Sequence, residues 1–218
     1  MRKHVVLLLL LTLAGSVLGL GNEKTRPTLE FSVAGMSCAD CAQSATKALK
    51  KIRGVRTITV DFASQHAVLE ATREIIREQI EEALSTLGFE ARFPGDTILQ
   101  PLSEEEKAGL DIATASQGKA FALADHLAAG KITIFDYYAD WCGPCRLLTP
   151  KLERLLLKYD ELALRTVDIS SWESEAAQQA NLPGLPYVRI YGPQGKLLGA
   201  VQGNQIRKVE EVIQRNTP

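Results

Sequence analysis

The chain has 218 residues, of which 45% are hydrophobic, and its formal net charge at pH 7 is −1. This length fits one large domain or two small ones, and the near-neutral charge excludes a strongly basic nucleic-acid-binding protein. All four cysteines occur in two Cys-x-x-Cys pairs, Cys38 with Cys41 and Cys142 with Cys145. No cysteine is left over, so the pairs predict dithiol chemistry or metal binding and not a disulfide-stapled scaffold.

Residues 1–21 have the pattern of an export signal. A positively charged start is followed by an apolar run over residues 5–13, and Val17 and Gly19 are small residues before a cleavage point. This is typical of a secretory signal peptide. The alternative is an uncleaved membrane anchor, although the uncharged stretch is a little shorter than the ~20 residues of a spanning helix. In either case we expect an exported protein in an oxidising compartment such as the bacterial periplasm, free or anchored to the inner membrane.

Residues 28–94 combine strand and helix patterns. Leu29, Phe31 and Val33 alternate with polar residues, which predicts a half-buried strand. Apolar residues at helical spacing over residues 75–87 predict an amphipathic helix. The predicted order is strand 28–34, helix 42–52, strands 55–61 and 67–71, helix 75–87 and strand 89–93. This βαββαβ order is the ferredoxin-like arrangement.

The first cysteine pair lies in the motif GMSCADC, on the first strand-to-helix loop of this unit. Together with the closing stretch ALSTLGFEARF, the motif resembles the heavy-metal-associated domain over about residues 29–94. The resemblance implies that Cys38 and Cys41 are the metal thiolates and that Met36 points into the core. Two thiolates with no third ligand nearby suit Cu(I), with Hg(II) as the alternative, whereas a closed zinc site needs four ligands. A disulfide between the two cysteines and a degenerate adaptor domain are the other readings.

A linker is predicted over residues 95–110, where the composition becomes polar and Ser103 begins a capping box for a short helix. From residue 111 onward, strand and helix patterns alternate, which predicts an α/β sandwich around a central sheet. The predicted helices cover residues 117–129, 146–159, 172–180 and 205–215, and the strands begin at residue 132 and cover residues 162–168, 187–191 and 196–201. For Trp172 we favour a packing role in the core or on the surface, and a position that flanks the dithiol is the alternative.

The second cysteine pair follows an apolar strand in the stretch ITIFDYYADWCGPCR. At a helix N-terminus, unpaired backbone N–H groups and the positive end of the dipole favour thiolate over thiol at the first cysteine. Only the thiolate attacks a disulfide. We therefore expect Cys142 to be the exposed nucleophile and Cys145, one turn further along, to be the buried resolving thiol.

WCGPC preceded by a strand with an acidic residue resembles the thioredoxin active site, and the resemblance covers about residue 110 to the C-terminus. It implies that Asp136 is the buried acid that relays a proton for the resolving cysteine. It also implies that Pro186 follows a cis peptide bond and faces the dithiol. Substrate-contacting positions implied in the same way are Trp141, Leu185 and Gly203. Leu164 stands where some thioredoxins have a lysine that pairs with the buried acid.

The two resemblances predict a two-domain α/β and α+β protein, with a ferredoxin-like domain at 28–94 and a thioredoxin fold at 111–218. We expect an exported thiol–disulfide oxidoreductase linked to a soft-metal-binding domain, serving copper handling or the reduction of metal-ligating cysteines. The Gly-Pro dipeptide resembles that of reducing thioredoxins, which favours a reductase. Expected partners are a disulfide-containing client such as a metalloprotein, and a membrane electron donor; no nucleotide or flavin motif is found. The alternative is a periplasmic Cu(I) or Hg(II) chaperone or scavenger with an accessory thioredoxin-like domain.

Overall fold

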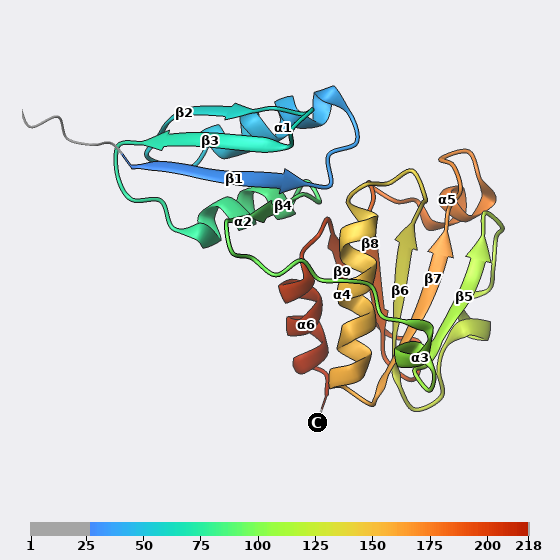
Figure 1. Cartoon of the computed structure of the whole chain (residues 1–218). Helices are drawn as coiled ribbons and strands as arrows, with labels where there is room; N and C mark the ends of the chain where they lie inside the picture. The colour runs from blue at the N-terminus through green and yellow to red at the C-terminus, as the bar shows by residue number, and fades with distance from the viewer. Residues whose placement is uncertain (1–26, 218) are drawn as a thin grey trace, which may run out of the picture.

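The computed structural model describes residues 27–217, so the predicted signal peptide or anchor over residues 1–21 lies outside the described residues. Within this range no helix has the length and apolar character needed to cross a membrane. The described chain forms two domains, each built around its own sheet (Figure 1).

The first domain is a four-stranded antiparallel sheet with two helices packed on one face, as the βαββαβ pattern predicts (Figure 1). Its strands follow the order β2-β3-β1-β4. The elements are β1 (Thr28–Ala34), α1 (Ala39–Lys50), β2 (Val55–Val60), β3 (His66–Ala71), α2 (Arg77–Ser85) and β4 (Glu90–Arg92). Phe31, Leu49 and Ile80 are fully buried between sheet and helices, and Met36 joins this core, as the resemblance implies.

The second domain is a five-stranded mixed sheet in the order β5-β7-β6-β8-β9. Strands β5, β7 and β6 are parallel to one another, β8 is antiparallel to β6, and β9 is antiparallel to β8. The elements after the linker are β5 (Ile112–Gln117), the 3-10 turn η1 (Leu123–His126), β6 (Ile132–Tyr138), α4 (Cys145–Lys158), β7 (Leu162–Asp168), α5 (Glu175–Ala180), β8 (Tyr187–Tyr191), β9 (Leu197–Gln202) and α6 (Ile206–Gln214).

Strand β6 lies at the centre of this sheet and is buried on both faces. Because successive side chains of a strand point to opposite faces, Ile134 packs with the leucines and valines of α4 and α6, whereas Phe135 packs with the alanines of α5. The apolar run before the second cysteine pair is therefore the central strand of the domain, and the loop that follows it carries the dithiol.

The helix predicted over residues 117–129 is wrong. Strand β5 ends at Gln117, Gly118 adopts a positive φ of 76°, and only the short turn η1 follows. The apolar spacing there serves the sheet face, since Phe121 stacks on Phe135 with ring centroids 6.0 Å apart. Strand β5 was missed because its sequence IATASQ is rich in small residues, and its parallel pairing with β7 is a tertiary contact.

The segment between the domains packs on the second domain. Helix α3 (Glu104–Lys107) begins at Ser103 with the predicted capping box. Leu102 is buried, and Arg154 of α4 donates a hydrogen bond of 2.7 Å to the carbonyl oxygen of Gln100. Nζ of Lys107 lies 3.1 Å from the Glu153 carboxylate of α4. The solvated linker expected from composition is therefore held in place by burial, a hydrogen bond and an ion pair.

Substitution of Lys107 with Met tests this anchoring. The Glu153 side chain is only 9% exposed, so removing its partner leaves a buried charge without compensation. We expect the free energy of unfolding to fall by roughly 1–3 kcal/mol, less than for a fully buried pair because Lys107 is partly exposed. Urea denaturation followed by tryptophan fluorescence measures this, since both tryptophans belong to the second domain.

Lys119→Met is the matched control, because Lys119 forms an exposed ion pair with Glu175. Exposed pairs contribute about 0–1 kcal/mol, so this variant should unfold close to the parent. If Lys107→Met is no less stable than Lys119→Met, the linker contact does not anchor the chain.

Candidate functional site

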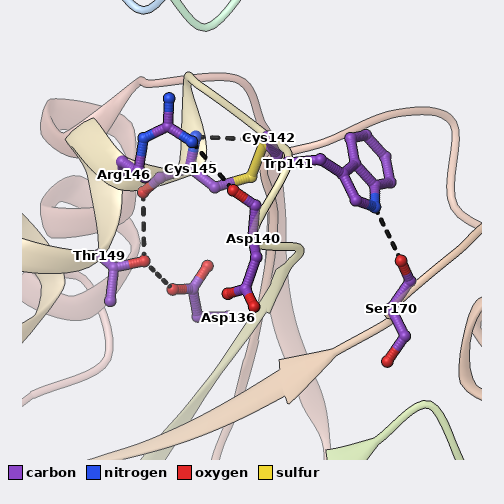
Figure 2. Close-up of a disulfide and its surroundings, with 8 residues drawn as sticks. All are labelled: Asp136, Asp140, Trp141, Cys142, Cys145, Arg146, Thr149 and Ser170. Atoms are coloured by element: carbon purple, nitrogen blue, oxygen red, sulfur yellow. Dashed lines mark hydrogen bonds between the residues drawn. A yellow bond between two sulfur atoms is a disulfide. The ribbon is translucent and has the colours of Figure 1, made fainter.

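The second cysteine pair joins the end of β6 to the start of α4 and forms a disulfide, with Cα atoms 5.3 Å apart (Figure 2). The backbone N–H of Cys145 donates to Sγ of Cys142 at 3.2 Å. After reduction, this N–H and the N-terminus of α4 would stabilise negative charge on the Cys142 sulfur. Cys145 is 1% exposed, as expected of a resolving thiol.

Cys142 is only 5% exposed, so the prediction of an exposed nucleophile is wrong for this structure. The reason lies outside the motif. Gly143, the next residue, is buried and lies against Gly35 and Ser37 of the first domain. The sequence around the dithiol could not reveal a cover that is supplied from another domain.

Asp136 lies beneath the dithiol with no exposed surface. Thr149 of α4 donates a hydrogen bond of 2.7 Å to its Oδ2, while Oδ1 accepts none from the described residues (Figure 2). Burial raises the pKa of Asp136 to about 7, a rise that the Thr149 hydrogen bond opposes and the negative charge of Glu153 reinforces. A carboxyl group with this pKa can take or release a proton near neutral pH.

Thr149 is a site residue that the sequence analysis missed. It follows Cys145 by four positions, so both side chains lie on one face of α4. Its hydroxyl also lies 3.2 Å from the carbonyl oxygen of Cys145. That spacing was the available signal, and the helix thereby ties the resolving cysteine to the buried acid.

Trp141 flanks the disulfide and is 48% exposed. Its Nε1 donates to the carbonyl oxygen of Ser170 at 2.7 Å, which fixes the indole ring (Figure 2). The ring of Trp172 lies beside it, with centroids 6.1 Å apart. Trp172 is itself 45% exposed, so it packs on the surface as expected, and it does so beside the tryptophan that flanks the dithiol.

The loop before β8 contributes the remaining positions. The Leu185–Pro186 peptide bond is cis, as the resemblance implies. Leu185 is half-buried and packs against the apolar cluster that contains both cysteines of this site. Gly203, with φ of 78°, donates its N–H to the carbonyl oxygen of Pro186 at 2.9 Å. These residues gather next to the dithiol, although their roles in substrate contact stay predictions.

The first cysteine pair also forms a disulfide, with Cα atoms 5.2 Å apart. Cys38 is exposed at the N-cap of α1, and Cys41 is half-buried in its first turn. Within residues 27–217 there is no group of three or more His, Cys, Asp or Glu side chains that could hold a metal ion. The donor set of this loop is therefore two sulfurs, which after reduction fits a soft, low-coordinate ion and not a closed zinc site.

The loops that carry the two disulfides lie against each other. A β-carbon at Gly143 would overlap the carbonyl oxygen of Gly35 and would lie 3.5 Å from Cβ of Ser37. Gly143 stands between the cysteines of the second pair, and Ser37 directly precedes Cys38. The loops that carry two cysteine pairs distant in the sequence thus meet at the domain interface.

Substitution of Asp136 with Asn tests the buried acid. A carboxyl group whose pKa is raised on folding destabilises the native state when it ionises, so the penalty grows from about pH 4 to about pH 7 and then stays constant. We expect Asp136→Asn to raise the free energy of unfolding of the oxidised protein by about 2–4 kcal/mol at pH 8. Below about pH 4 the two proteins should differ little, and urea denaturation across this range measures the difference.

Asp140→Asn serves as the control, because Asp140 is an exposed carboxylate on the same segment. It should change the free energy of unfolding by less than about 0.5 kcal/mol at every pH. A pH-independent gain in Asp136→Asn would show that the effect comes from packing and not from ionisation.

Comparison with known proteins finds similar thioredoxins, which cover less than half of this chain. Among solved structures, a reduced thioredoxin pre-protein from Schistosoma mansoni aligns with 28% identity and a TM-score of 0.41, covering 49% of this chain and 99% of its own. A thioredoxin from Aspergillus fumigatus is 31% identical over 103 residues, which are 45% of this chain and 94% of the relative. Thioredoxin-2 from Saccharomyces cerevisiae is 31% identical over 91 residues, 41% of this chain and 86% of the relative.

The family models divide the chain at the same place as its fold. The heavy-metal-associated domain matches residues 30–90, and thioredoxin matches residues 117–215. The two resemblances inferred from the motifs are therefore confirmed. With a relative matched over nearly its full length and a Cys-x-x-Cys pair at the end of the central strand, the chain belongs to the thioredoxin family through its second domain and carries a heavy-metal-associated domain in front of it.

Proposed function

We propose that this protein is a thiol–disulfide oxidoreductase whose thioredoxin domain reduces the Cys38–Cys41 disulfide of its own heavy-metal-associated domain. The observation that carries the proposal is the contact of Gly143, between the redox cysteines, with the loop that leads into Cys38. A dithiol normally reaches its substrate by diffusion, whereas here the substrate disulfide adjoins the active-site loop.

The reaction is a thiol–disulfide exchange. The Cys142 thiolate attacks one sulfur of the Cys38–Cys41 disulfide, so a mixed disulfide forms and the other sulfur leaves as a thiolate. Cys145 gives its proton to Asp136 and attacks the Cys142 sulfur, which releases the second thiolate of the first pair. Two electrons have then moved, Cys142–Cys145 is the disulfide, and Cys38 and Cys41 are reduced.

Reduction matters because only thiolates ligate a soft metal ion. Once reduced, Cys38 and Cys41 would hold Cu(I), with Hg(II) as the alternative, as a cargo for copper handling or for loading a client metalloprotein. The cysteines of such a client are further candidates for reduction by the same dithiol. The heavy-metal-associated family supports metal binding as a class, and the two-sulfur donor set supports a soft ion.

The cycle needs two electrons from outside the chain. We propose a dithiol protein at the membrane as the donor and an extracytoplasmic, oxidising compartment such as the periplasm as the setting. The signal-like pattern of residues 1–21 supports this placement. An oxidising compartment would also explain why a metal-binding dithiol is joined to its own reductase.

A trapped intermediate tests the proposal. Cys145→Ser retains the nucleophile but cannot resolve the mixed disulfide. In the oxidised variant Cys142 is a free thiol next to the Cys38–Cys41 disulfide, so without any added reductant we expect it to accumulate in a disulfide with Cys38 or Cys41 within one chain, and the other sulfur of that pair becomes a free thiol. Peptide mapping by mass spectrometry identifies the bond, and the extent should not depend on protein concentration.

The control is Cys142→Ser with Cys145→Ser, which should form no such bond. Mixed disulfides that form only between chains, and therefore increase with protein concentration, would contradict reduction within one chain.

A second candidate is a Cu(I) or Hg(II) chaperone or scavenger in which the thioredoxin domain is accessory. It is favoured by the exposure of Cys38 at the metal loop while Cys142 is covered. In this reading metal exchange occurs at an open surface, and the redox site contributes only protection or stability.

Recovery of Cu(I) binding separates the two candidates. Fully reduced protein should bind one Cu(I) in the parent and in Cys142→Ser, and none in Cys38→Ser with Cys41→Ser. After air oxidation and addition of limiting dithiothreitol, the parent should regain Cu(I) binding at least about tenfold faster than Cys142→Ser, because its own dithiol relays the electrons. Anaerobic competition with a chromogenic Cu(I) chelator measures the rate, and equal rates would favour the chaperone.

A further inference from the structure

The turn between α2 and β4 of the heavy-metal-associated domain fills the space beside the cis proline. A β-carbon at Gly88 would lie 2.6 Å from Cβ of Pro144 and 3.3 Å from Cδ of Pro186. Gly88 has a φ of 84° and is buried, as is Pro186. The backbone of the turn thus reaches both the active-site loop and the cis-proline loop, where no side chain would fit.

The same turn covers the backbone after β9. A β-carbon at Gly203 would overlap the carbonyl oxygen of Ser85 and would lie 3.0 Å from that of Thr86. The N–H of Asn204 donates to the Ser85 carbonyl oxygen at 3.0 Å. Gly203 and Asn204 are both buried. The surface around the cis proline and Gly203, where the thioredoxin resemblance predicts a substrate groove, is therefore covered by a segment of the chain itself.

An ion pair closes the edge of this contact. Lys151 of α4 donates to the Glu90 carboxylate of β4 and, at 3.2 Å, to Oδ1 of Asn204. Arg92 donates to the other oxygen of Glu90 at 2.9 Å. The side chains of Glu90 and Lys151 are 25% and 20% exposed. Burial would raise the pKa of Glu90, but the hydrogen bonds from Lys151 and Arg92 outweigh it and hold that pKa below its usual range.

We propose that Glu90 and Lys151 form a latch that keeps the heavy-metal-associated domain in the groove of the thioredoxin domain. The groove is thereby reserved for the chain's own domain and closed to disulfides of other proteins until the latch opens. The inference deepens the proposed function and rests on it for the identity of the substrate, but the latch itself depends only on the interface.

The fold permits opening without unfolding. The core of the heavy-metal-associated domain is one cluster of buried side chains, and the two clusters of the thioredoxin domain share no member with it. The contacts described between the domains are those of glycine backbone, of the turn after α2 and of the ion pair, together with the Leu147 side chain against Gly35. Separating the domains therefore breaks few contacts and leaves both cores intact.

Insulin reduction tests the latch. The full chain carrying Cys38→Ser and Cys41→Ser is the parent, so that only Cys142 and Cys145 react. We expect Glu90→Lys and Lys151→Glu each to accelerate the reduction of insulin disulfides by dithiothreitol about tenfold or more, because each places like charges across the interface. The combined Glu90→Lys and Lys151→Glu variant restores opposite charges and should return toward the parent rate.

Lys158→Glu is the matched control, since it makes the same charge change on α4 but breaks a pair with Glu210 within the thioredoxin domain. Its rate should stay within about twofold of the parent, because this pair lies within the thioredoxin domain and Lys158 is largely exposed. The rate of Cys142 alkylation by iodoacetamide in the reduced protein is a second readout and should rise with the insulin rate.

If Glu90→Lys unfolds the first domain, Lys151→Glu alone tests the latch, because Lys151 lies on α4 of the thioredoxin domain. Insulin and alkylation rates that stay within about twofold of the parent in folded Lys151→Glu would overturn the latch. Failure of the combined variant to restore the parent rates would overturn the pairing. Because the assay does not use Cys38 or Cys41, its result stands even if no mixed disulfide forms within the chain.

Discussion

The close approach of two backbones at Gly35 and Gly143 is the constraint on which the arrangement depends. Each glycine lies in a cysteine motif, Gly35 before the Cys38–Cys41 pair and Gly143 between Cys142 and Cys145. Gly35 needs a positive φ of 96° to turn from β1 into its loop, and Gly143 has no side chain to hold the neighbouring loop away. Gly35 and Gly143 therefore together allow the two loops to approach each other at backbone distance.

Electrostatics extends the redox site beyond the dithiol. Among residues 27–217 Asp136 has no lysine partner, and Leu164 is buried at the position where the thioredoxin resemblance would place one. The negative charge of the nearby Glu153 raises the pKa of Asp136 further. Glu153 in turn forms an ion pair with Lys107 of the linker helix α3. The segment between the domains is therefore linked to the buried Asp136 through one ion pair and one charged neighbour.

The sequence predicted both sheets, most helices and the cis bond at Pro186, because these follow from periodicity and from specific motifs. It failed where a tertiary contact decides the outcome. Strand β5 depends on parallel pairing with β7, and the burial of Cys142 accompanies a cover that another domain supplies. Thr149 could have been found from its spacing to Cys145, whereas the pairing of Glu90 with Lys151 crosses 61 positions of sequence and has no local signal.

The docked arrangement changes how the two cysteine pairs communicate. A flexible tether would supply the metal loop to the dithiol at roughly millimolar effective concentration, and the linker composition favoured that picture. The described linker is instead held by Leu102 and Lys107, so the loops are neighbours before any reaction starts. Cys38 is exposed, while Gly143, next to the covered Cys142, lies against the loop that precedes Cys38. The preference of the Cys142–Cys145 dithiol for one substrate would then arise from proximity, because the loop that carries it already contacts the loop of the Cys38–Cys41 disulfide in the same chain.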